Sequence, residues 1–323
     1  MDRSEPAFAA GASLATLEQR AALLRKLREF FYQRDFLEIE TPLLAGEIIP
    51  ELHIEPIQTE DGAFLQASPE LHMKRLLAAG AQAIFQVTRS FRGGERGRLH
   101  NPEFTIVEWY HAGDDMRAGI DLLDELMQSL SKTPPAARTT FAEAFQRTLG
   151  LCPHTATIEE LSAAAKLVNI PVPRQMDTAD RDEWLNLLLA TCIESELGRN
   201  RPEIVYHYPA TQASLAKIVP TEFGYDVAER FELYYRGVEL ANGFHELTDA
   251  AEQRRRFEAV NAARVADGRR ALPLPASLLA ALAAGLPACS GAALGFDRLV
   301  MLAVGGGAIR DVMSFSPQAD EAQ

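Results

Sequence analysis

The chain has 323 residues, of which 47% are hydrophobic, so it is long and apolar enough to bury a sizeable core. Its formal net charge of −13 at pH 7 argues against an extended nucleic-acid-binding surface, because neutralising phosphates requires clustered Lys and Arg. The three cysteines are odd in number, far apart and outside any CxxC spacing, which argues against a disulfide framework or a zinc knuckle and fits a reducing cytosol.

A cytoplasmic location is also expected, because neither of two candidate segments has the features of an export signal or a membrane span. The start, MDRSEPAFAAG, contains acidic residues and no apolar stretch of signal length. The uncharged stretch 271–296 has the length of a membrane span, but prolines and glycines interrupt it repeatedly. It therefore predicts a buried helix followed by a strand.

The first part of the chain predicts two helices, each followed by an extended segment. Apolar residues recur with helical spacing over 14–34, and the chain then becomes extended in FLEIETPLL, where Pro42 ends the segment. SPELHMKRLLAAG, residues 68–80, predicts a short helix with Ser68 as its cap. AIFQVTRSFR, residues 83–92, predicts a strand.

LHNPEFTIVEWY, residues 99–110, predicts the next strand, joined to the previous one by the glycine-rich loop 93–103. Because side chains alternate along a strand, Glu108 shares a face with Ile106 and Tyr110. A carboxylate among apolar and aromatic neighbours is costly unless a cation meets it. The strand therefore predicts a site that holds a positive charge.

The remainder of the chain predicts a helical insertion, a hairpin and a strand–turn–helix. Residues 114–200 have mostly helical patterns, and we interpret them as an insertion within a single domain that spans 1–323. FELYYRGVELANGF, at 231–244, predicts a hairpin. The stretch 291–309 predicts a strand, a turn at Asp297-Arg298 and a helix.

The predicted hairpin at 231–244 puts two carboxylates on one face. If it turns at Arg236-Gly237, Tyr234 lies opposite Glu239, and Glu232 lies two residues before Tyr234 on the same side. Like charges placed in this way repel each other unless a cation lies between them, and carboxylate oxygens suit Mg²⁺. A solvated sheet face explains the same pattern, so the hairpin alone leaves both interpretations open.

Two arginines are candidates for binding an anion. Arg298 follows a Gly-Phe-Asp turn and precedes LVMLAV, so it is expected at the beginning of a helix, where exposed amides favour anions. Arg92 ends a strand before the glycine-rich loop, and His100 lies beyond that loop. Taken alone, each has another explanation, because many helices begin with Asp-Arg for capping and lone arginines at strand ends are usually surface residues.

The order of these segments resembles the three signature motifs of class II aminoacyl-tRNA synthetases. The matching segments are the helix and strand that end at Pro42, then FRGGERGRLHNPEF, and then GAALGFDRLVMLA. The lysine branch is the closer match, through SPELHMKRLL, HNPEFTIVEWY and FELYYRGVELANGFHELTDA. The resemblance implies an α+β fold, in which helices flank an antiparallel sheet of about six strands. It also implies a homodimer that forms through the first helix and the strand ending at Pro42.

The resemblance implies which residues contact ATP. Arg92 is expected at the α-phosphate and the amino-acid carboxylate, and Arg298 at the γ-phosphate, so both are expected to be catalytic. His100 is expected near the γ-phosphate, and Phe104 is expected to stack on adenine. The remaining implied ATP contacts are Glu95, Asn101 and Glu239, and the implied Mg²⁺ ligands are Glu232 and Glu239.

The resemblance also implies a pocket for a lysine-like substrate. Glu70 is expected to hold the backbone amino group of the substrate. The side-chain ammonium is expected among Glu108, Tyr110 and Glu246, which would answer why strand 99–110 carries a buried carboxylate. The other implied members of the pocket are Ser68, Asn242 and Ala293.

Two features depart from lysyl-tRNA synthetases. Their second motif usually reads Arg-x-Glu, whereas here Gly93 and Gly94 follow Arg92, and Glu95 comes only afterwards and is expected to substitute. Few residues precede the first helix, so no anticodon-binding barrel is expected there. Such a catalytic core resembles the elongation factor P–lysine lysyltransferase family, and Ala293 supports this because lysyl-tRNA synthetases have glycine there.

Members of that family use ATP to activate (R)-β-lysine as an adenylate and pass it to a lysine side chain of elongation factor P. The implied partners are therefore elongation factor P and (R)-β-lysine, with no tRNA and no membrane. A truncated lysyl-tRNA synthetase, another amide-forming ligase and a non-catalytic paralogue stay open as alternatives. A paralogue should have lost its phosphate- and metal-binding groups, yet these are present: Arg92, His100, Glu232, Glu239 and Arg298. Only Gly94 favours it.

Overall fold

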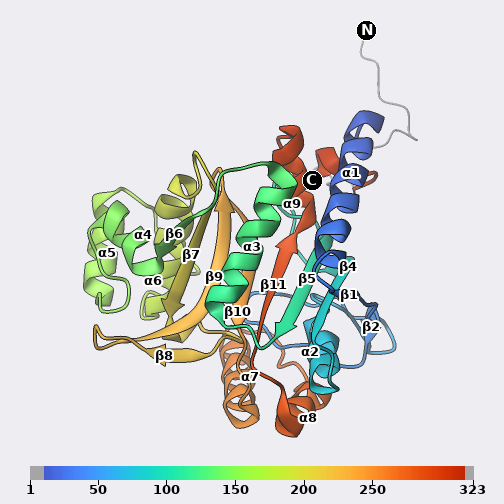
Figure 1. Cartoon of the computed structure of the whole chain (residues 1–323). Helices are drawn as coiled ribbons and strands as arrows, with labels where there is room; N and C mark the ends of the chain where they lie inside the picture. The colour runs from blue at the N-terminus through green and yellow to red at the C-terminus, as the bar shows by residue number, and fades with distance from the viewer. Residues whose placement is uncertain (1–10, 317–323) are drawn as a thin grey trace. The chain divides into compact units, whose positions relative to one another are not determined.

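The structure is a computed structural model that describes residues 11–316, and they form two compact units (Figure 1). Within the described residues, unit 1 comprises the chain up to Trp109, Ala250–Leu286 and the chain from Leu294 onward. Unit 2 comprises Tyr110–Asp249 and Pro287–Ala293. The chain passes from one unit to the other within two strands, β5 (Glu103–Ala112) and β11 (Cys289–Gly295).

Unit 1 contains a sheet in which β1, β4 and β5 follow one another in that order, with β1 parallel to β4. A separate antiparallel pair joins β2 to β3. The strands that begin and end in this unit are β1 (Leu37–Glu38), β2 (Leu44–Ala45), β3 (Phe64–Leu65) and β4 (Ala83–Phe91). Its helices are α1 (Leu14–Tyr32), α2 (Glu70–Ala78), α7 (Ala250–Ala266), α8 (Ala276–Gly285), α9 (Phe296–Val304) and the 3₁₀ helix Ile309–Val312.

Unit 2 contains a sheet in the order β11, β10, β9, β7, β6, with β8 also paired to β9. Its strands besides β11 are β6 (Ala137–Thr140), β7 (Glu203–Pro209), β8 (Ile218–Pro220), β9 (Asp226–Tyr235) and β10 (Val238–His245). Helix α3 packs on β9 and β10 (Figure 1). The helices are α3 (Met116–Ser131), α4 (Phe141–Leu149), α5 (Ile158–Leu167), α6 (Arg181–Leu188), the π-helical turn Leu189–Ile193 and the 3₁₀ helices Glu194–Glu196 and Ala210–Gln212.

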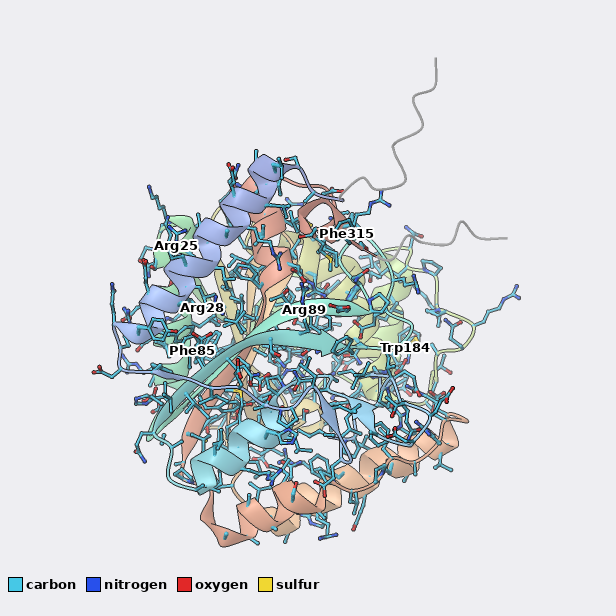
Figure 2. All side chains as sticks on the ribbon, turned by 90° about the vertical axis from the view of Figure 1, so that its right-hand side faces the viewer. Arg25, Arg28, Phe85, Arg89, Trp184 and Phe315 are labelled. Atoms are coloured by element: carbon cyan, nitrogen blue, oxygen red, sulfur yellow. The ribbon has the colours of Figure 1, made fainter. Side chains whose placement is uncertain are left out.

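The core of unit 1 is aromatic where α1 meets the sheet. The Phe31 ring of α1 stacks on Phe85 of β4, with ring centroids 4.6 Å apart, and lies 5.3 Å from the Trp109 ring of β5. All three side chains are fully buried, and burial of each contributes about 1.5–3 kcal/mol to folding. Arg28 of α1, which Figure 2 labels, forms an ion pair of 2.9 Å with Glu38 of β1.

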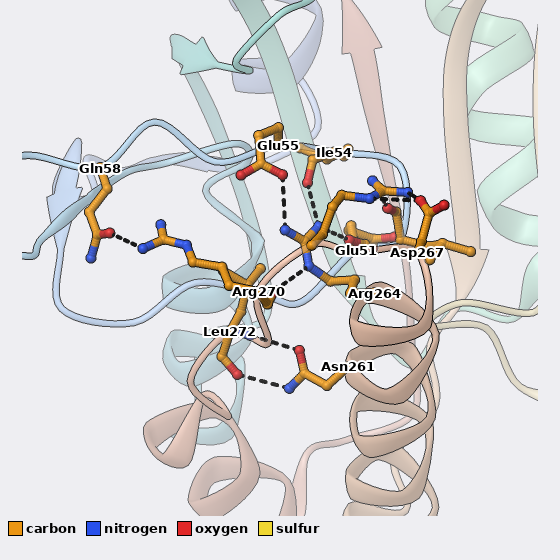
Figure 3. A network of polar contacts seen from close by, with 11 residues as sticks. Glu51, Ile54, Glu55, Gln58, Asn261, Arg264, Asp267, Arg270 and Leu272 are labelled. Carbon is orange, nitrogen blue, oxygen red and sulfur yellow. Dashed lines mark hydrogen bonds and ion pairs between the residues drawn. The ribbon is translucent and has the colours of Figure 1, made fainter. Parts of the chain in front are cut away.

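A fully buried arginine, Arg264 of α7, holds a long loop in unit 1 (Figure 3). Its guanidinium donates to the backbone oxygens of Glu51, Ile54 and Arg270 at 2.8 to 3.1 Å. It also forms an ion pair of 3.0 Å with Glu55. These charge-assisted bonds fix the backbone path of the loop.

Several element boundaries differ from those that the sequence predicts. The expected strand at 36–44 is divided: Leu37–Glu38 form β1, and Leu44 begins β2, with Pro42, which has no N–H, between them. Helix α2 begins at Glu70, so Ser68 is not its cap residue, although its hydroxyl accepts the Glu70 N–H. Strand β5 begins only at Glu103, after Pro102.

The sheet strands are not all antiparallel, which corrects the expected sheet. β1 is parallel to β4, and β6 is parallel to β7. Strand β6 (Ala137–Thr140) lies within the segment 114–200, which the sequence predicted to be mostly helical. Its last two residues, Thr139 and Thr140, are β-branched, which favours a strand, and they pair with Val205 and Tyr206 of β7.

The hairpin of β9 and β10 confirms the predicted turn and register. Arg236 and Gly237 both have positive φ, 53° and 70°, as a two-residue type I′ turn requires. Tyr234 lies opposite Glu239, as expected. A bulge between Glu239 and Ala241 then shifts the pairing by one residue, so Glu232 lies opposite Asn242. None of the helices formed by residues 11–316 is both long and apolar enough to cross a bilayer.

Candidate active site

In unit 1, the loop between β4 and β5 presents Arg92. The Arg92 guanidinium lies over the Phe104 ring, 5.0 Å from its centroid, and its Nη1 is 3.9 Å from Glu95 Oε1. The backbone holds the base of the loop, because Arg92 N–H donates to Pro102 O and Gly93 N–H donates to Glu55 O. The structure thus brings three of the expected ATP contacts together: Arg92, Glu95 and Phe104.

Gly94 stands where the resemblance implied a glutamate, and its backbone conformation explains the glycine. Its φ is +76°, in the left-handed region that L side chains rarely adopt. A side chain would meet no heavy atom within 4 Å, so the backbone angle and not crowding selects glycine. Glu95, the next residue, supplies the carboxylate beside Arg92.

Arg298 and His100 form a second pair of unit 1. Arg298 is the third residue of α9, which confirms the predicted position at the beginning of a helix. Its Nη2 lies 2.9 Å from His100 Nε2, and its Nε donates to Leu99 O at 3.2 Å. Partial burial, to which the Arg298 charge adds, lowers the pKa of His100 below its ordinary value. The imidazole is therefore neutral at pH 7, so its Nε2 accepts from Arg298.

Asp297 anchors the start of α9. Its Oδ2 accepts the Thr105 N–H of β5 at 2.7 Å, and its Oδ1 pairs with Arg20 of α1 at 2.7 Å. Asn101 is also buried and donates through its side-chain amide to Glu103 O at 2.6 Å. The two Asp297 bonds hold the start of α9, and with it Arg298, against β5 and α1. The position of Arg298 is therefore fixed by tertiary contacts and not by helix capping alone.

Glu108, on β5, is 2% exposed, as its strand pattern predicts. Its Oε2 accepts the Ser68 hydroxyl at 2.6 Å, and Ser68 in turn accepts the Glu70 N–H at 3.0 Å. Glu70 forms an ion pair of 2.5 Å with Lys74, one turn further along α2, whose side chain is 1% exposed. Unit 1 therefore brings together three of the expected pocket residues: Ser68, Glu70 and Glu108.

In unit 2, Tyr110 and Glu246 approach the same glycine. A Cβ atom added to Gly291 of β11 would lie 2.3 Å from Cδ1 and Cε1 of Tyr110. It would lie 3.0 Å from Glu246 Oε1. Tyr110 is 3% and Glu246 1% exposed. The sequence predicted Tyr110 and Glu246 as neighbours, but it gave no role to Gly291, which makes room for both.

The β9–β10 hairpin places the two carboxylates that were expected to bind Mg²⁺ in different surroundings. Glu232 is 5% exposed and accepts three bonds: from Arg230 at 2.5 Å, Tyr208 at 2.5 Å and Tyr234 at 2.6 Å. Burial and the Glu232 charge hold the pKa of both tyrosines well above the ordinary value, so both hydroxyls keep their protons and donate. Glu239 is only partly buried.

These contacts do not fit Glu232 as a Mg²⁺ ligand. Its oxygens already receive three donors, and the Arg230 guanidinium next to it repels a second cation. Burial lowers the pKa of Arg230, but its neighbours, chiefly the negative charge of Glu232, raise it by more, so the pKa of Arg230 lies above its ordinary value. No cluster of three or more His, Cys, Asp or Glu suited to a metal occurs in residues 11–316. Glu239 remains as a carboxylate that could contact a cation held mainly by phosphates.

The remaining expected pocket residues of unit 2 are Asn242 and Ala293. Asn242 lies on β10 and is partly exposed, and its Oδ1 accepts from Arg230 Nε at 3.1 Å. Ala293 lies on β11, two residues after Gly291, and is partly buried. The sequence patterns described above assigned no role to Arg230 or Lys74. The signal for each was available, because Arg230 precedes Glu232 by two residues and Lys74 follows Glu70 by one helical turn.

Comparison with known proteins places the chain in a family. The family model of class II tRNA synthetases (D, K and N) matches residues 9–319. The chain belongs to the class II tRNA synthetase family. This membership confirms the α+β fold class that the three motifs predicted.

Its relatives narrow the branch of the class II synthetases. An elongation factor P–(R)-β-lysine ligase of Klebsiella pneumoniae strain 342 is 46% identical over 317 residues, which cover 94% of this chain and 96% of the relative. The protein of the same name from Salmonella dublin is 46% identical over 316 residues, with the same coverage. Within the class II synthetases, the chain therefore groups with proteins of this name, as Ala293 and the few residues before the first helix suggested.

Proposed function

We propose that this protein is an ATP-dependent ligase that activates (R)-β-lysine as an adenylate and transfers it to a lysine side chain of elongation factor P. The proposal depends on one observation. In a chain that is 46% identical to elongation factor P–(R)-β-lysine ligases, Arg92 lies over the Phe104 ring and Arg298 contacts His100. A non-catalytic paralogue has no need for these groups. Lysine-type specificity is supported by the buried carboxylates Glu108 and Glu246.

In the first step, a carboxylate oxygen of β-lysine attacks the α-phosphorus of ATP, and the bond from that phosphorus to pyrophosphate breaks. Negative charge develops on the phosphoryl oxygens, and fixed positive donors stabilise it. We assign this role to Arg92 and Arg298. Both are held in place before the substrate arrives, Arg92 over Phe104 and Arg298 by Leu99 O and neutral His100. No side-chain nucleophile is needed.

ATP is proposed to bind with Mg²⁺, which neutralises charge on the phosphates and binds their oxygens. Glu239 is the carboxylate that we assign to this ion, and Glu232 is left out because of its contacts with Arg230 and the two tyrosines. For the amino acid, we assign the side-chain ammonium to Glu108, Tyr110 and Glu246. Charge-assisted bonds of this kind each contribute about 1.5–3 kcal/mol.

In the second step, the acceptor lysine attacks the acyl carbon of the adenylate as a neutral amine. The bond from that carbon to the AMP oxygen breaks, an amide forms, and the amine nitrogen loses a proton. Holding the amine and the adenylate in a reactive geometry accounts for most of the acceleration that such a step requires. We propose a protein amine and not tRNA as the acceptor, since the named relatives are ligases of elongation factor P.

A cytoplasmic homodimer is part of the proposal. Large apolar side chains between residues 14 and 44 of unit 1 are exposed, and a second copy of the chain is proposed to cover them. They are Leu14, Tyr32, Leu37, Leu43 and Leu44. Burial of this region against a second copy would remove them from water, as the resemblance to class II synthetases implies.

The experiment that tests the function compares two acceptors. The purified protein is incubated with ATP, Mg²⁺ and (R)-β-lysine, once with elongation factor P and once with total tRNA. Intact mass should show one added β-lysyl group on elongation factor P, while acid gels show no charged tRNA. Charged tRNA with unmodified elongation factor P would instead support a truncated synthetase. Absence of amino-acid-dependent exchange of pyrophosphate into ATP would indicate a non-catalytic paralogue.

A further inference from the structure

Arg230 of β9 is the centre of a polar network within unit 2. Its guanidinium donates in three directions: Nη2 to Glu232 Oε1 at 2.5 Å, Nη1 to Gln212 O at 3.1 Å and Nε to Asn242 Oδ1 at 3.1 Å. The guanidinium also lies over the Tyr208 ring, 4.7 Å from the centroid. A planar group held at its three nitrogens and on one face has a fixed orientation.

Glu232 is the counterion that keeps Arg230 in this position. Its other oxygen accepts the Tyr208 and Tyr234 hydroxyls, so the carboxylate cannot turn away from Arg230 without breaking three bonds. Its side chain is 6% exposed and that of Arg230 is 22% exposed. The contacts of the Glu232 carboxylate are thus those of a counterion for Arg230, and they explain why Glu232 fits a Mg²⁺ ligand poorly.

Arg230 determines which way the Asn242 amide faces. Arginine has only donors, so the Asn242 atom that meets Arg230 Nε must be the oxygen. The amide nitrogen of Asn242 therefore points elsewhere with its two hydrogens. Because Asn242 is partly exposed, it offers a donor to a bound molecule, and the group that it meets must be an acceptor such as a carboxylate or phosphate oxygen.

We propose that Arg230, held by Glu232, is a positioning residue that fixes the Asn242 amide as a hydrogen-bond donor to an anionic oxygen of the amino-acid substrate. The identity of that substrate rests on the proposed function. The orientation of the amide does not, since it follows from contacts within the free protein. Glu232 acts through Arg230 and not through a metal.

A double-mutant cycle tests whether Arg230 acts through Asn242. Arg230→Lys keeps the positive charge beside Glu232 but loses the Nε donor, and it should raise the KM for (R)-β-lysine roughly tenfold while leaving the KM for ATP unchanged. The same substitution should have no further effect in the Asn242→Ala background. An equal rise in both backgrounds would overturn the proposal, because Arg230 would then act without Asn242.

Two further variants separate this role from metal binding and from loss of structure. Glu232→Gln should leave the Mg²⁺ concentration for half-maximal pyrophosphate exchange unchanged, whereas a raised requirement would make Glu232 a metal ligand and refute the assignment. Arg138→Lys is the matched control, because Arg138 is an exposed arginine of unit 2 whose ion-pair partner is Asp121. It should leave every kinetic constant unchanged.

A measurement on the free protein does not depend on the proposed function. The side-chain amide signal of Asn242 in a ¹H–¹⁵N spectrum, assigned by its loss in Asn242→Asp, should shift in Arg230→Lys and not in Arg138→Lys. An unmoved signal would overturn the proposal whether or not the protein activates an amino acid. A shifted signal in a protein that activates no amino acid would retain the positioning role and refute only the proposed function.

Discussion

Replacing Gly291 with alanine should impair binding of the amino acid while sparing ATP. The added Cβ would lie 2.3 Å from two carbons of the Tyr110 ring, whereas ordinary contacts begin near 3.4 Å. The ring must therefore withdraw by about 1 Å, or the strand must shift by as much. A displacement of this size in an active site costs about 10² in rate. We expect kcat/KM for (R)-β-lysine to fall about a hundredfold.

The assay is amino-acid-dependent exchange of pyrophosphate into ATP, with the amino acid and ATP varied separately. Gly46→Ala is the matched control, because a Cβ there would meet nothing within 4 Å. Overpacking at Gly291 should also lower stability by about 1–3 kcal/mol, so the thermal midpoint of each variant is measured first. If folded Gly291→Ala kept its KM for β-lysine, Tyr110 would not line the pocket. An equal rise in the KM for ATP would indicate general distortion.

Three other predictions concern single side chains. Arg92→Ala and Arg298→Ala should each lower adenylate formation by about 10²–10³, and near-normal exchange in either would place the phosphates elsewhere. Ala293→Gly should shift preference from (R)-β-lysine toward α-lysine by about 10–200-fold, which competition between the two isomers would measure, and an unchanged ratio would contradict the role of the methyl group. Arg264→Met should lower unfolding free energy by about 2–4 kcal/mol in urea titrations, because it leaves buried carbonyl oxygens without donors. Exposed Arg25→Met should not.

The sequence predicted the hairpin at β9–β10 well because local chemistry specifies it. Arg236-Gly237 can adopt the positive φ values of a tight turn, and that turn sets which residues lie opposite each other. The bulge after Glu239 was not predictable, because nothing in the alternation of β10 marks the extra residue. Its effect is to place Asn242 opposite Glu232, within reach of Arg230.

Residues whose roles depend on distant partners were harder to predict. Arg264 lies in an arginine-rich helix that indicates solvent exposure, and its bonds are to loop carbonyls some 210 residues away in the sequence. A helical pattern reports which face is apolar. It does not report where backbone oxygens of another segment will need donors.

Glu232 and Glu239 show what the alternation of side chains along two strands predicts and what it does not. Both lie on the same hairpin, and both were predicted to share one face, which the register supports. The alternation of side chains along a strand predicts which face a residue lies on, but not which charged group will contact it. Here Arg230, on the same strand as Glu232, contacts Glu232 at 2.5 Å. Two like carboxylates need a compensating cation, as the sequence implied, but an arginine of the chain meets that need for one of them. Because Arg230 holds Glu232, Glu239, which is partly buried, is the carboxylate to test for Mg²⁺ dependence.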